Sequence, residues 1–518
     1  MTTHQSLALG FFIAIGLVLG VCGEHFEVTS AQQLIKVLNI SEANHFDASI
    51  TLLDDLDFSD SALTLPFGVS SDGSCVSYTG VFEGNGHTIK GLVMNNEDNQ
   101  GYNNAGLFCA LGNATFENLV IDSSCSFTGY SYAGALSVSL TGSLDITNVT
   151  NKAAVSGDDG AGGFVGIIQS SSNLNISFSN SVSNGIVTGI YGMGGFVGMI
   201  QSNSDLNISF SYSINNGIVT GSYIMGGFVG VIYENNNMKM TISNCVNNGL
   251  ITGIDGLVGG FTGGFWDNRY MEIIISNCVN NGQITGELAV GGFVGGIEQE
   301  NGTSMILFNC TNTGEINGTD FIGGLVGFIG SELDQHSVSF SIISSANKGN
   351  VLAVSFACGM ICVYFKNRGD VNGTVLNSIN KGSVKATTNA YGITDTITKA
   401  RNVVSMGEVT ASGSFTFWNI STDVDLFFGL DGKCVNCTGN TTLFVHNTST
   451  GFYEVVGSGK HVHDLLNAEV EKQNYGMVWT KELELVEPGQ PSGGNKHGVS
   501  LFWVGVVVAL AVHVAMAQ

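Results

Sequence analysis

The chain has 518 residues, with 17 Lys and Arg against 42 Asp and Glu, a formal net charge of −25, and 72 Gly but only 3 Pro. This charge excludes nucleic acid, anionic lipid headgroups and heparin-like polymers as expected partners, because all of them are bound through Lys and Arg. The length would suggest several domains, but a repeat protein can grow without dividing, since each unit contacts only its neighbours.

Residues 1–23 are typical of a secretory signal peptide, with an apolar run over 7–21 and a small residue, Gly23, at the expected cleavage point. A short internal helix is the alternative.

Residues 24–150 follow as an N-terminal cap with the first coils. Within them, Ser30 and Gln33 form a capping box, and Ala31, Leu34 and Leu38 share one helical face. We expect a helix here that covers one end of a strand stack.

A glycine-rich motif organises residues 151–410 and returns about every 32 residues. Each unit has three apolar runs of strand length, such as 194–200, 206–210 and 217–221, and these predict one coil of a parallel β-helix. Matched residues of successive coils should lie about 4.8 Å apart. The Gly-Gly-Phe-Val-Gly motif and its variants occupy 162–166, 194–198, 226–230, 259–263, 291–295 and 323–327, and a second motif occupies 211–221, 243–253, 276–286 and 308–318.

Equivalent residues of the repeat predict columns along the stack. An aromatic column would stabilise the core by roughly 2–3 kcal/mol per ring, and an asparagine column would form an amide ladder at a corner, although Asn-Asn-Gly is also a favoured turn. The apolar residues that directly follow the aromatics should point to the opposite face of the strand. They would form an exposed apolar stripe there, unless the strand is covered on both faces. The three columns are Phe164, Phe196, Phe228, Phe261, Phe293 and Leu325; Asn215, Asn247, Asn280, Asn312, Asn347 and Asn380; and Val165, Val197, Val229, Val294, Val326 and Ile361.

The order of these segments resembles the GLUG-motif surface proteins, which are similar to pectin-lyase-like right-handed β-helices. The resemblance covers residues 28–410 and rests on the cap helix, the strand at 50–58, Phe-Glu-Gly-Asn-Gly-His-Thr-Ile-Lys-Gly-Leu at 82–92, Gly-Leu-Phe at 106–108 and the glycine motifs. It implies a right-handed parallel β-helix with an extracellular, adhesin-like role. No catalytic residue is implied by the motif.

The C-terminal part of the chain predicts a cap and a lipid anchor. Residues 411–487 lose the repeat and are interpreted as a C-terminal cap. Residues 488–500 form a polar linker with small residues at Ser492 and Gly493, and 501–518 form an apolar tail, the pattern of a GPI-attachment signal. A transmembrane helix is the rival reading, but the apolar run is short and interrupted by His513. The predicted location is the outer leaflet of the plasma membrane.

Thirteen Asn-x-Ser/Thr sequons predict glycosylation in a secreted chain. Asn175 and Asn207 lie one repeat apart, and their apolar neighbours should point the other way, which would leave both amides facing solvent. Chance in an Asn-rich sequence is the alternative. The sequons lie at Asn39, Asn113, Asn148, Asn175, Asn207, Asn301, Asn309, Asn317, Asn372, Asn419, Asn436, Asn440 and Asn447.

Ten cysteines remain after the signal segment, and the secretory context permits disulfides. Cys358 and Cys362 would lie roughly 13 Å apart on an extended run, which would prevent them from pairing. A column of three cysteines predicts a ladder of small side chains, with a bridge between adjacent coils as the alternative. Cys434 and Cys437 predict a local disulfide rather than half of a zinc site. The column consists of Cys245, Cys278 and Cys310.

Asp255, Glu287 and Asp320 are the candidate catalytic residues. They fall at or next to one repeat position, and stacked carboxylates about 5 Å apart would suit a retaining glycosidase or a Ca²⁺ site. A solvated corner is the simpler interpretation, so we expect neither a metal nor a cofactor. A lyase is disfavoured because the coils lack the cations that a uronate substrate needs.

The sequence therefore predicts a GPI-anchored, glycosylated β-helix with a structural or adhesive role toward a carbohydrate or a protein of a host or neighbouring cell, with a glycoside hydrolase as the alternative.

Overall fold

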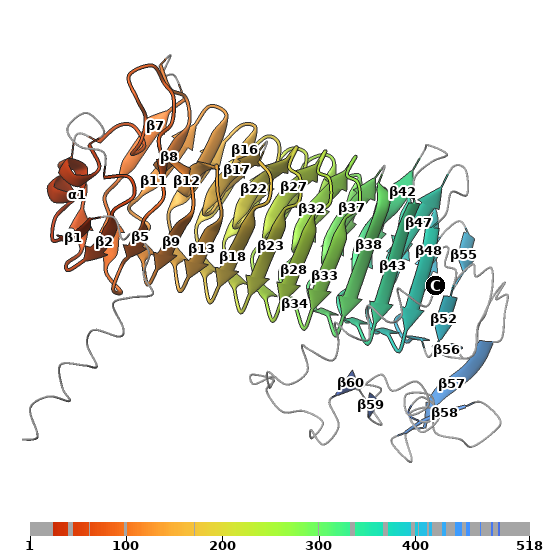
Figure 1. Ribbon diagram of the computed structural model, residues 1–518. Helices are drawn as coiled ribbons and strands as arrows, with labels where there is room; N and C mark the ends of the chain where they lie inside the picture. Colours follow the sequence, from red (N-terminus) through yellow and green to blue (C-terminus); the bar gives the residue numbers. More distant parts are fainter. Residues whose placement is uncertain are drawn as a thin grey trace, which may run out of the picture.

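The protein is a parallel β-solenoid with a short helix at its N-terminal end (Figure 1). The computed structural model describes residues 24–39, 45–61, 63–97, 101–169, 171–298, 300–331, 337–365, 371–394, 399–401, 403–411, 414–416, 427–430, 441–447, 452–455, 467, 478–479 and 485–486. Coil follows coil at a spacing of about 32 residues through the regular part of the stack. The expectation of an all-β solenoid with a capping helix is confirmed.

One coil contains five short strands where the sequence predicted three. These are β17 (Val165–Gln169), β18 (Asn175–Ser179), β19 (Val182–Ser183), β20 (Ile186–Gly189) and β21 (Met193–Gly194). The two additional strands, β19 and β21, have two residues each; β19 lies at the asparagine corner, and β21 ends on the first glycine of the pair. Segments that short show no apolar periodicity, so the sequence pattern could not reveal them.

In the described residues, the coils stack into four long sheets, and β59 (Val478–Trp479) and β60 (Leu485–Val486) form a separate two-stranded sheet. In the described residues, sheet I has 13 strands from β1 (His25–Val28) to β52 (Lys399–Arg401), and sheet II has 15 from β3 (Leu56–Asp57) to β58 (Phe452–Val455). Sheet III has 11 strands and includes β20. Sheet IV has two parallel stacks of strands, and each regular coil contributes one strand to each stack. We call the stack that contains β21 the first arm and the stack that contains β17 the second arm.

The two arms of sheet IV are separated by the second glycine of the pair and the aromatic residue after it, such as Gly163 and Phe164. In an early coil, the single strand β12 (Tyr132–Leu140) pairs with both β16 (Gly160–Gly162) and β17, with an irregularity after Gly134. In the next coil, the chain bends between the arms. A Cβ on Gly163 would collide with the carbonyl oxygen of Gly195 in the following coil, so the close approach of the two backbones requires glycine.

The aromatic column lies in the core, and its rings stack from coil to coil. Ring centroids are 4.7 Å apart for Phe196 and Phe228 and 4.9 Å for Phe228 and Phe261. The prediction of an exposed valine stripe is wrong, because Val165 and its equivalents are also fully buried in the same core. The bend places Phe164 between two strands, so the alternation of a straight strand does not apply and Phe164 and Val165 both face inward.

The asparagine column is a continuous buried ladder. Each Nδ2 donates to the Oδ1 of the next coil, over 2.8 Å from Asn215 to Asn247 and 2.7 Å from Asn247 to Asn280. The ladder continues over 2.7–2.8 Å to Asn312, Asn347 and Asn380. Both interpretations of the motif hold together, because several of these amides also bond the glycine two residues later, as in a turn.

Helix α1 (Ala31–Val37) covers the first coil. The Ser30 hydroxyl accepts a hydrogen bond from the Gln33 amide, and the Gln33 side chain accepts one from Thr29 N–H. Ala31, Leu34 and Val37 are buried against the stack. The predicted N-cap at Ser30 is therefore confirmed. In the usual capping box the Gln33 side chain would accept a hydrogen bond from the N–H of Ser30, whereas here it accepts one from Thr29, one residue earlier.

The cysteines include one pairing that the sequence analysis excluded. Cys358 and Cys362 form a disulfide with a Cα–Cα separation of 5.5 Å. The prediction was wrong because the run is not extended. The first cysteine ends β46 (Phe356–Cys358), the second lies in β47 (Ile361–Phe365), and the chain bends between these strands as in the other coils. Cys245, Cys278 and Cys310 are free and buried, which confirms the ladder.

Candidate functional site

The three candidate acids lie at one corner, between sheets III and IV, on successive coils. The Asp255 amide donates to the Ser222 carbonyl of the preceding coil, and the Asp320 amide donates to the Glu287 carbonyl over 2.9 Å. Asp255 and Glu287 are exposed, whereas Asp320 is half-buried and accepts a hydrogen bond from Ser355 over 2.8 Å. Two carboxylates in water interact weakly with their surroundings. This is the arrangement of a solvated corner.

Within the described residues, no group of three or more His, Cys, Asp and Glu side chains could hold a metal ion. The hydroxyl of Ser355 and the carboxylate of Asp320 are engaged with one another. The corner therefore provides neither a buried acid for catalysis nor a set of carboxylates around one point.

A polar groove of about 580 Å³ crosses the outer face of sheet I, and the sequence analysis did not foresee it. Its side chains bond from coil to coil: Asn207 Nδ2 donates to Asn175 Oδ1 over 3.1 Å, and Ser177 Oγ donates to Asp145. Lys239 closes one end, in an ion pair of 2.8 Å with Glu272. The signal was present in the Asn-Ile-Ser-Phe-Ser repeats, whose alternate residues are polar and point outward.

Three predicted glycan acceptors line this groove, namely Asn113, Asn175 and Asn207. All three are exposed, and the neighbouring Ile176 and Ile208 are buried. A glycan on Asn207 would replace one of the two hydrogens of the Nδ2 group that donates to Asn175. Elsewhere, Asn148 and Asn301 are exposed; Asn39, Asn309, Asn317 and Asn372 are half-buried; and Asn419, Asn436, Asn440 and the side chain of Asn447 lie outside the described residues.

The outer face of sheet IV carries a second apolar cluster, separate from the main core. The two arms face each other there: Leu257 on the first arm occupies the space beside Gly264 on the second, and the rings of Phe321 and Phe328 lie 4.9 Å apart. We call this cluster the seam. Its buried members are Ile167, Met199, Ile224, Val231, Leu257 and Ala289.

Four aromatic side chains are here named the aromatic patch: Tyr191 and Tyr233 pack against the seam, and Tyr223 and Trp266 are their neighbours along the stack. Tyr191 and Tyr223 lie just before the first-arm strands β21 and β26 (Met225–Gly226), with ring centroids 6.4 Å apart. Tyr233 and Trp266 end the second-arm strands β27 (Val229–Tyr233) and β32 (Thr262–Trp266) and are partners in register. Burial raises the pKa of Tyr233, and the charges of Glu234, Tyr191 and Tyr132 raise it further. One tyrosine of each pair, Tyr191 and Tyr233, packs against the seam, so both pairs border it.

A second buried amide column lies at the corner between sheets IV and I and ends on a carboxyl group. Asn203 Nδ2 donates to Asn235 over 3.1 Å, Asn235 to Asn268 over 3.0 Å, and Asn268 to Glu300 Oε1 over 2.8 Å. Thr303 Oγ1 donates to Glu300 Oε2 over 2.7 Å. Burial raises the pKa of Glu300 from its ordinary 4.5 to about 7, against the opposing effect of these hydrogen bonds.

Replacing Glu300 with Gln should make stability less dependent on pH. Because the folded-state pKa of Glu300 is raised, the wild-type chain loses stability as the pH rises from about 4.5 to about 7. We expect Glu300→Gln to gain roughly 3 kcal/mol at pH 8 and to leave stability unchanged at pH 4. Urea unfolding at both pH values measures this, with exposed Glu315→Gln as the control. Equal gains at both pH values would contradict the assignment.

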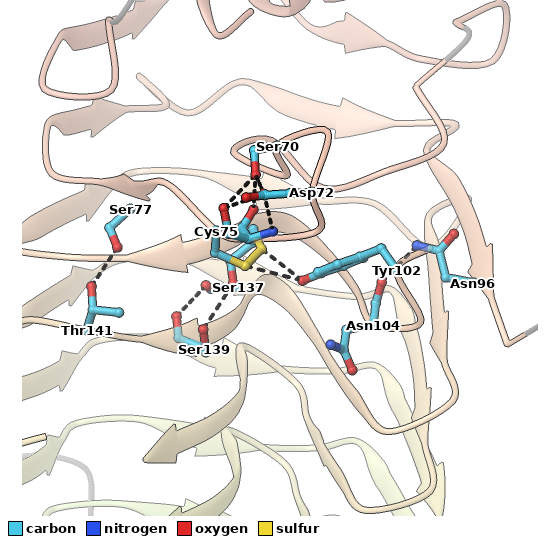
Figure 2. The surroundings of a disulfide bond; sticks show 12 residues. Ser70, Asp72, Cys75, Ser77, Asn96, Tyr102, Asn104, Ser137, Ser139 and Thr141 are labelled. Carbon is cyan, nitrogen blue, oxygen red and sulfur yellow. Dashed lines mark hydrogen bonds between the residues drawn. A yellow bond between two sulfur atoms is a disulfide. The ribbon is translucent and has the colours of Figure 1, made fainter. Parts of the chain in front are cut away.

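A disulfide holds a surface loop onto the first coils. Cys75 is exposed, Cys109 is buried, and the residues are 34 apart in sequence. Figure 2 shows the Tyr102 hydroxyl directed at the bond, 2.9 Å from Cys109 Sγ. In the loop, hydrogen bonds from Ser70 and then Ser74 lower the pKa of Asp72 to about 2. The loop is thus fixed by a covalent bond and by a charged turn.

Replacing Cys75 with Ser should destabilise the N-terminal coils by about 3 kcal/mol, because the unfolded chain is no longer closed into a loop of this length. Hydrogen exchange of the amides in β8 (Ala105–Leu111) measures the local effect. Ser71→Ala, at an exposed position of the same loop, should change exchange little. Unaltered protection in Cys75→Ser would show that the bond is absent or without effect.

Several predictions lie outside the described residues: the signal peptide at 1–23, the pair Cys434 and Cys437, the linker with Ser492 and Gly493, and the tail at 501–518. Within the part of the chain that is described, no helix has both the length and the hydropathy needed to cross a bilayer.

Comparisons with known proteins are sparse. A stretch of 91 residues, 17% of the chain, is 41% identical to Halomucin of Haloquadratum walsbyi, and the match spans only 1% of that protein. A solved structure from Bacteroides ovatus, provisionally assigned as an immunoglobulin A1 protease, aligns over 91% of this chain and 94% of its own at 14% identity and a TM-score of 0.28. The fold therefore rests on the strand register of this chain and not on that likeness. No family model matches the sequence.

Proposed function

We propose that the protein is a cell-surface β-solenoid with a structural or adhesive role, glycosylated and held at the outer leaflet by a GPI anchor attached at Ser492 or Gly493. The single observation that supports this best is the unbroken buried ladder from Asn215 to Asn380, which makes the coils one continuous elongated body. Such a body suits a coat or a stalk that projects binding surfaces from a membrane.

Charge and glycan acceptors are consistent with this role. A net charge of −25 keeps neighbouring molecules apart at high surface density. Exposed sequons on the solenoid's outer face would place glycans at the surface that faces water or a neighbouring cell. Its partner would be a carbohydrate or a protein of a host or neighbouring cell, because the sparse basic residues disfavour polyanions.

The proposal is tested on cells that produce the protein. Phosphatidylinositol-specific phospholipase C should release the intact ectodomain from the cell surface, and enzymatic removal of N-glycans should increase its gel mobility. Replacing Ser492 and Gly493 with bulky residues should abolish release. A protein that stays with the membrane after phospholipase treatment, or that is never surface-exposed, would refute the anchor.

A further inference from the structure

We propose that the aromatic patch and its acidic rim form a docking site for a cationic, amphipathic peptide segment of a partner protein. The inference deepens the proposed surface role and depends on it only for its biological setting. Its structural basis is the combination of exposed aromatic rings, an apolar floor and carboxylates on both sides. Within the patch, Tyr233 and Trp266 end the second-arm strands β27 and β32, which stack side by side (Figure 1), and Tyr191 and Tyr223 precede the first-arm strands β21 and β26.

The patch exposes more apolar surface than folding requires. The seam beneath it is already filled, so its rings are not needed to complete the main core. Yet Tyr223 is 47% and Trp266 40% exposed, and Ile254 and Leu288 on the adjoining corner are 64% and 39% exposed. Contiguous exposed apolar side chains with a polar rim are typical of a protein-binding surface.

Acidic residues border the patch on both arms. Glu234 and Asp267 directly follow Tyr233 and Trp266, and both are exposed. On the other side, Asp255 and Glu287 occupy the corner described above. Within the described part of the chain, Asp255, Asp267 and Glu287 form no ion pair, whereas Glu234 accepts a hydrogen bond from Ser202 over 3.1 Å. Their charges are thus available to a ligand.

Few positive charges of the protein itself compete for this rim. Between residues 153 and 345 the sequence has two Lys or Arg residues, Lys239 and Arg269. Lys239 is paired with Glu272 on sheet I, and Arg269 lies at the next corner, beyond Asp267. Trp and Tyr faces attract Arg and Lys by cation–π interaction, and carboxylates add charge-assisted hydrogen bonds. A segment of alternating basic and apolar residues matches both features.

The test measures binding of a fluorescent Arg-Leu repeat peptide to the purified full-length chain by anisotropy, at low and high salt. Trp266→Ala should weaken binding about tenfold. Asp255→Asn with Asp267→Asn should weaken it and flatten its salt dependence. Tyr212→Ala, an exposed tyrosine on another corner, is the matched control and should bind as the parent does. Circular dichroism verifies that each variant is folded.

Three results would overturn the proposal: undiminished binding by Trp266→Ala, equal binding of a Glu-Leu repeat peptide, or displacement of the peptide by a neutral β-linked glucose oligosaccharide, which would make the patch a glycan platform instead. Each is separable from failure of the surface role. Peptide binding is measured on purified protein, whereas anchoring and surface exposure are measured on cells.

Discussion

Replacing Phe228 with Ala is expected to lower the free energy of unfolding of the central coils by about 4 kcal/mol. The Phe228 ring is fully buried, stacks between Phe196 and Phe261, and meets Phe210 edge-on with centroids 5.5 Å apart. The parallel hydrogen bonds on either side fix the coil spacing, so the neighbouring rings cannot close the cavity. Urea unfolding followed by circular dichroism measures the loss.

The matched control for this substitution is Tyr212→Ala, which removes an aromatic ring from an exposed corner of the adjoining coil. Its expected effect is within about 0.5 kcal/mol. Because each coil contacts only its neighbours, hydrogen exchange should show the Phe228→Ala loss concentrated near the altered coil. A loss below about 1 kcal/mol would mean that the ring is not enclosed as described.

Replacing Asn280 with Ala should cost a similar amount, about 4 kcal/mol, for a different reason. The Nδ2 group of Asn247 would lose its acceptor, Asn280 Oδ1. Asn312 Oδ1 and the backbone oxygen of Gly282 would lose their donor, Asn280 Nδ2, which now lies 2.7 and 3.0 Å away. These groups are buried, and each unsatisfied one costs about 1–3 kcal/mol. The measurement is again urea unfolding, with hydrogen exchange of the amides in β34 (Val279–Asn280) and β39 (Thr311–Asn312).

The adjacent residue provides a close control. Asn281 also bonds from coil to coil, with its Nδ2 2.8 Å from Asn248 Oδ1, but both side chains are exposed. Water can replace that bond, so Asn281→Ala should cost less than about 0.5 kcal/mol. Equal effects at Asn280 and Asn281 would show that burial of the ladder does not decide its contribution.

The stacked coils could be predicted from the sequence because, in a solenoid, residues one repeat apart lie next to each other in successive coils. The Phe196 and Phe228 stack, the Asn247 and Asn280 ladder and the Cys245 column all follow from matched positions in the repeat. The N-cap at Ser30 was predictable for another reason, since capping depends on residues within one turn. The same correspondence brought Asp255 and Glu287 to one corner.

Features that depend on local bends were not predictable from the period. The bend after Gly162 reversed the expected exposure of Val165, and the equivalent bend joined Cys358 to Cys362. The polar groove and the aromatic patch were missed because each combines side chains from several strands whose outward faces the sequence could not assign. Glu300 was missed because its column has no glycine motif to mark it.

Successive repeats are single rungs of one continuous stack. Asn184 and Thr313 lie four coils apart on the exposed ladder that passes through Asn216, Asn248 and Asn281. Spin labels on Asn184→Cys and Thr313→Cys should give a single narrow distance near 19 Å by pulsed electron spin resonance, from about 4.8 Å per rung. A broad distribution or a distance well beyond 30 Å would contradict stacking and indicate separate modules instead.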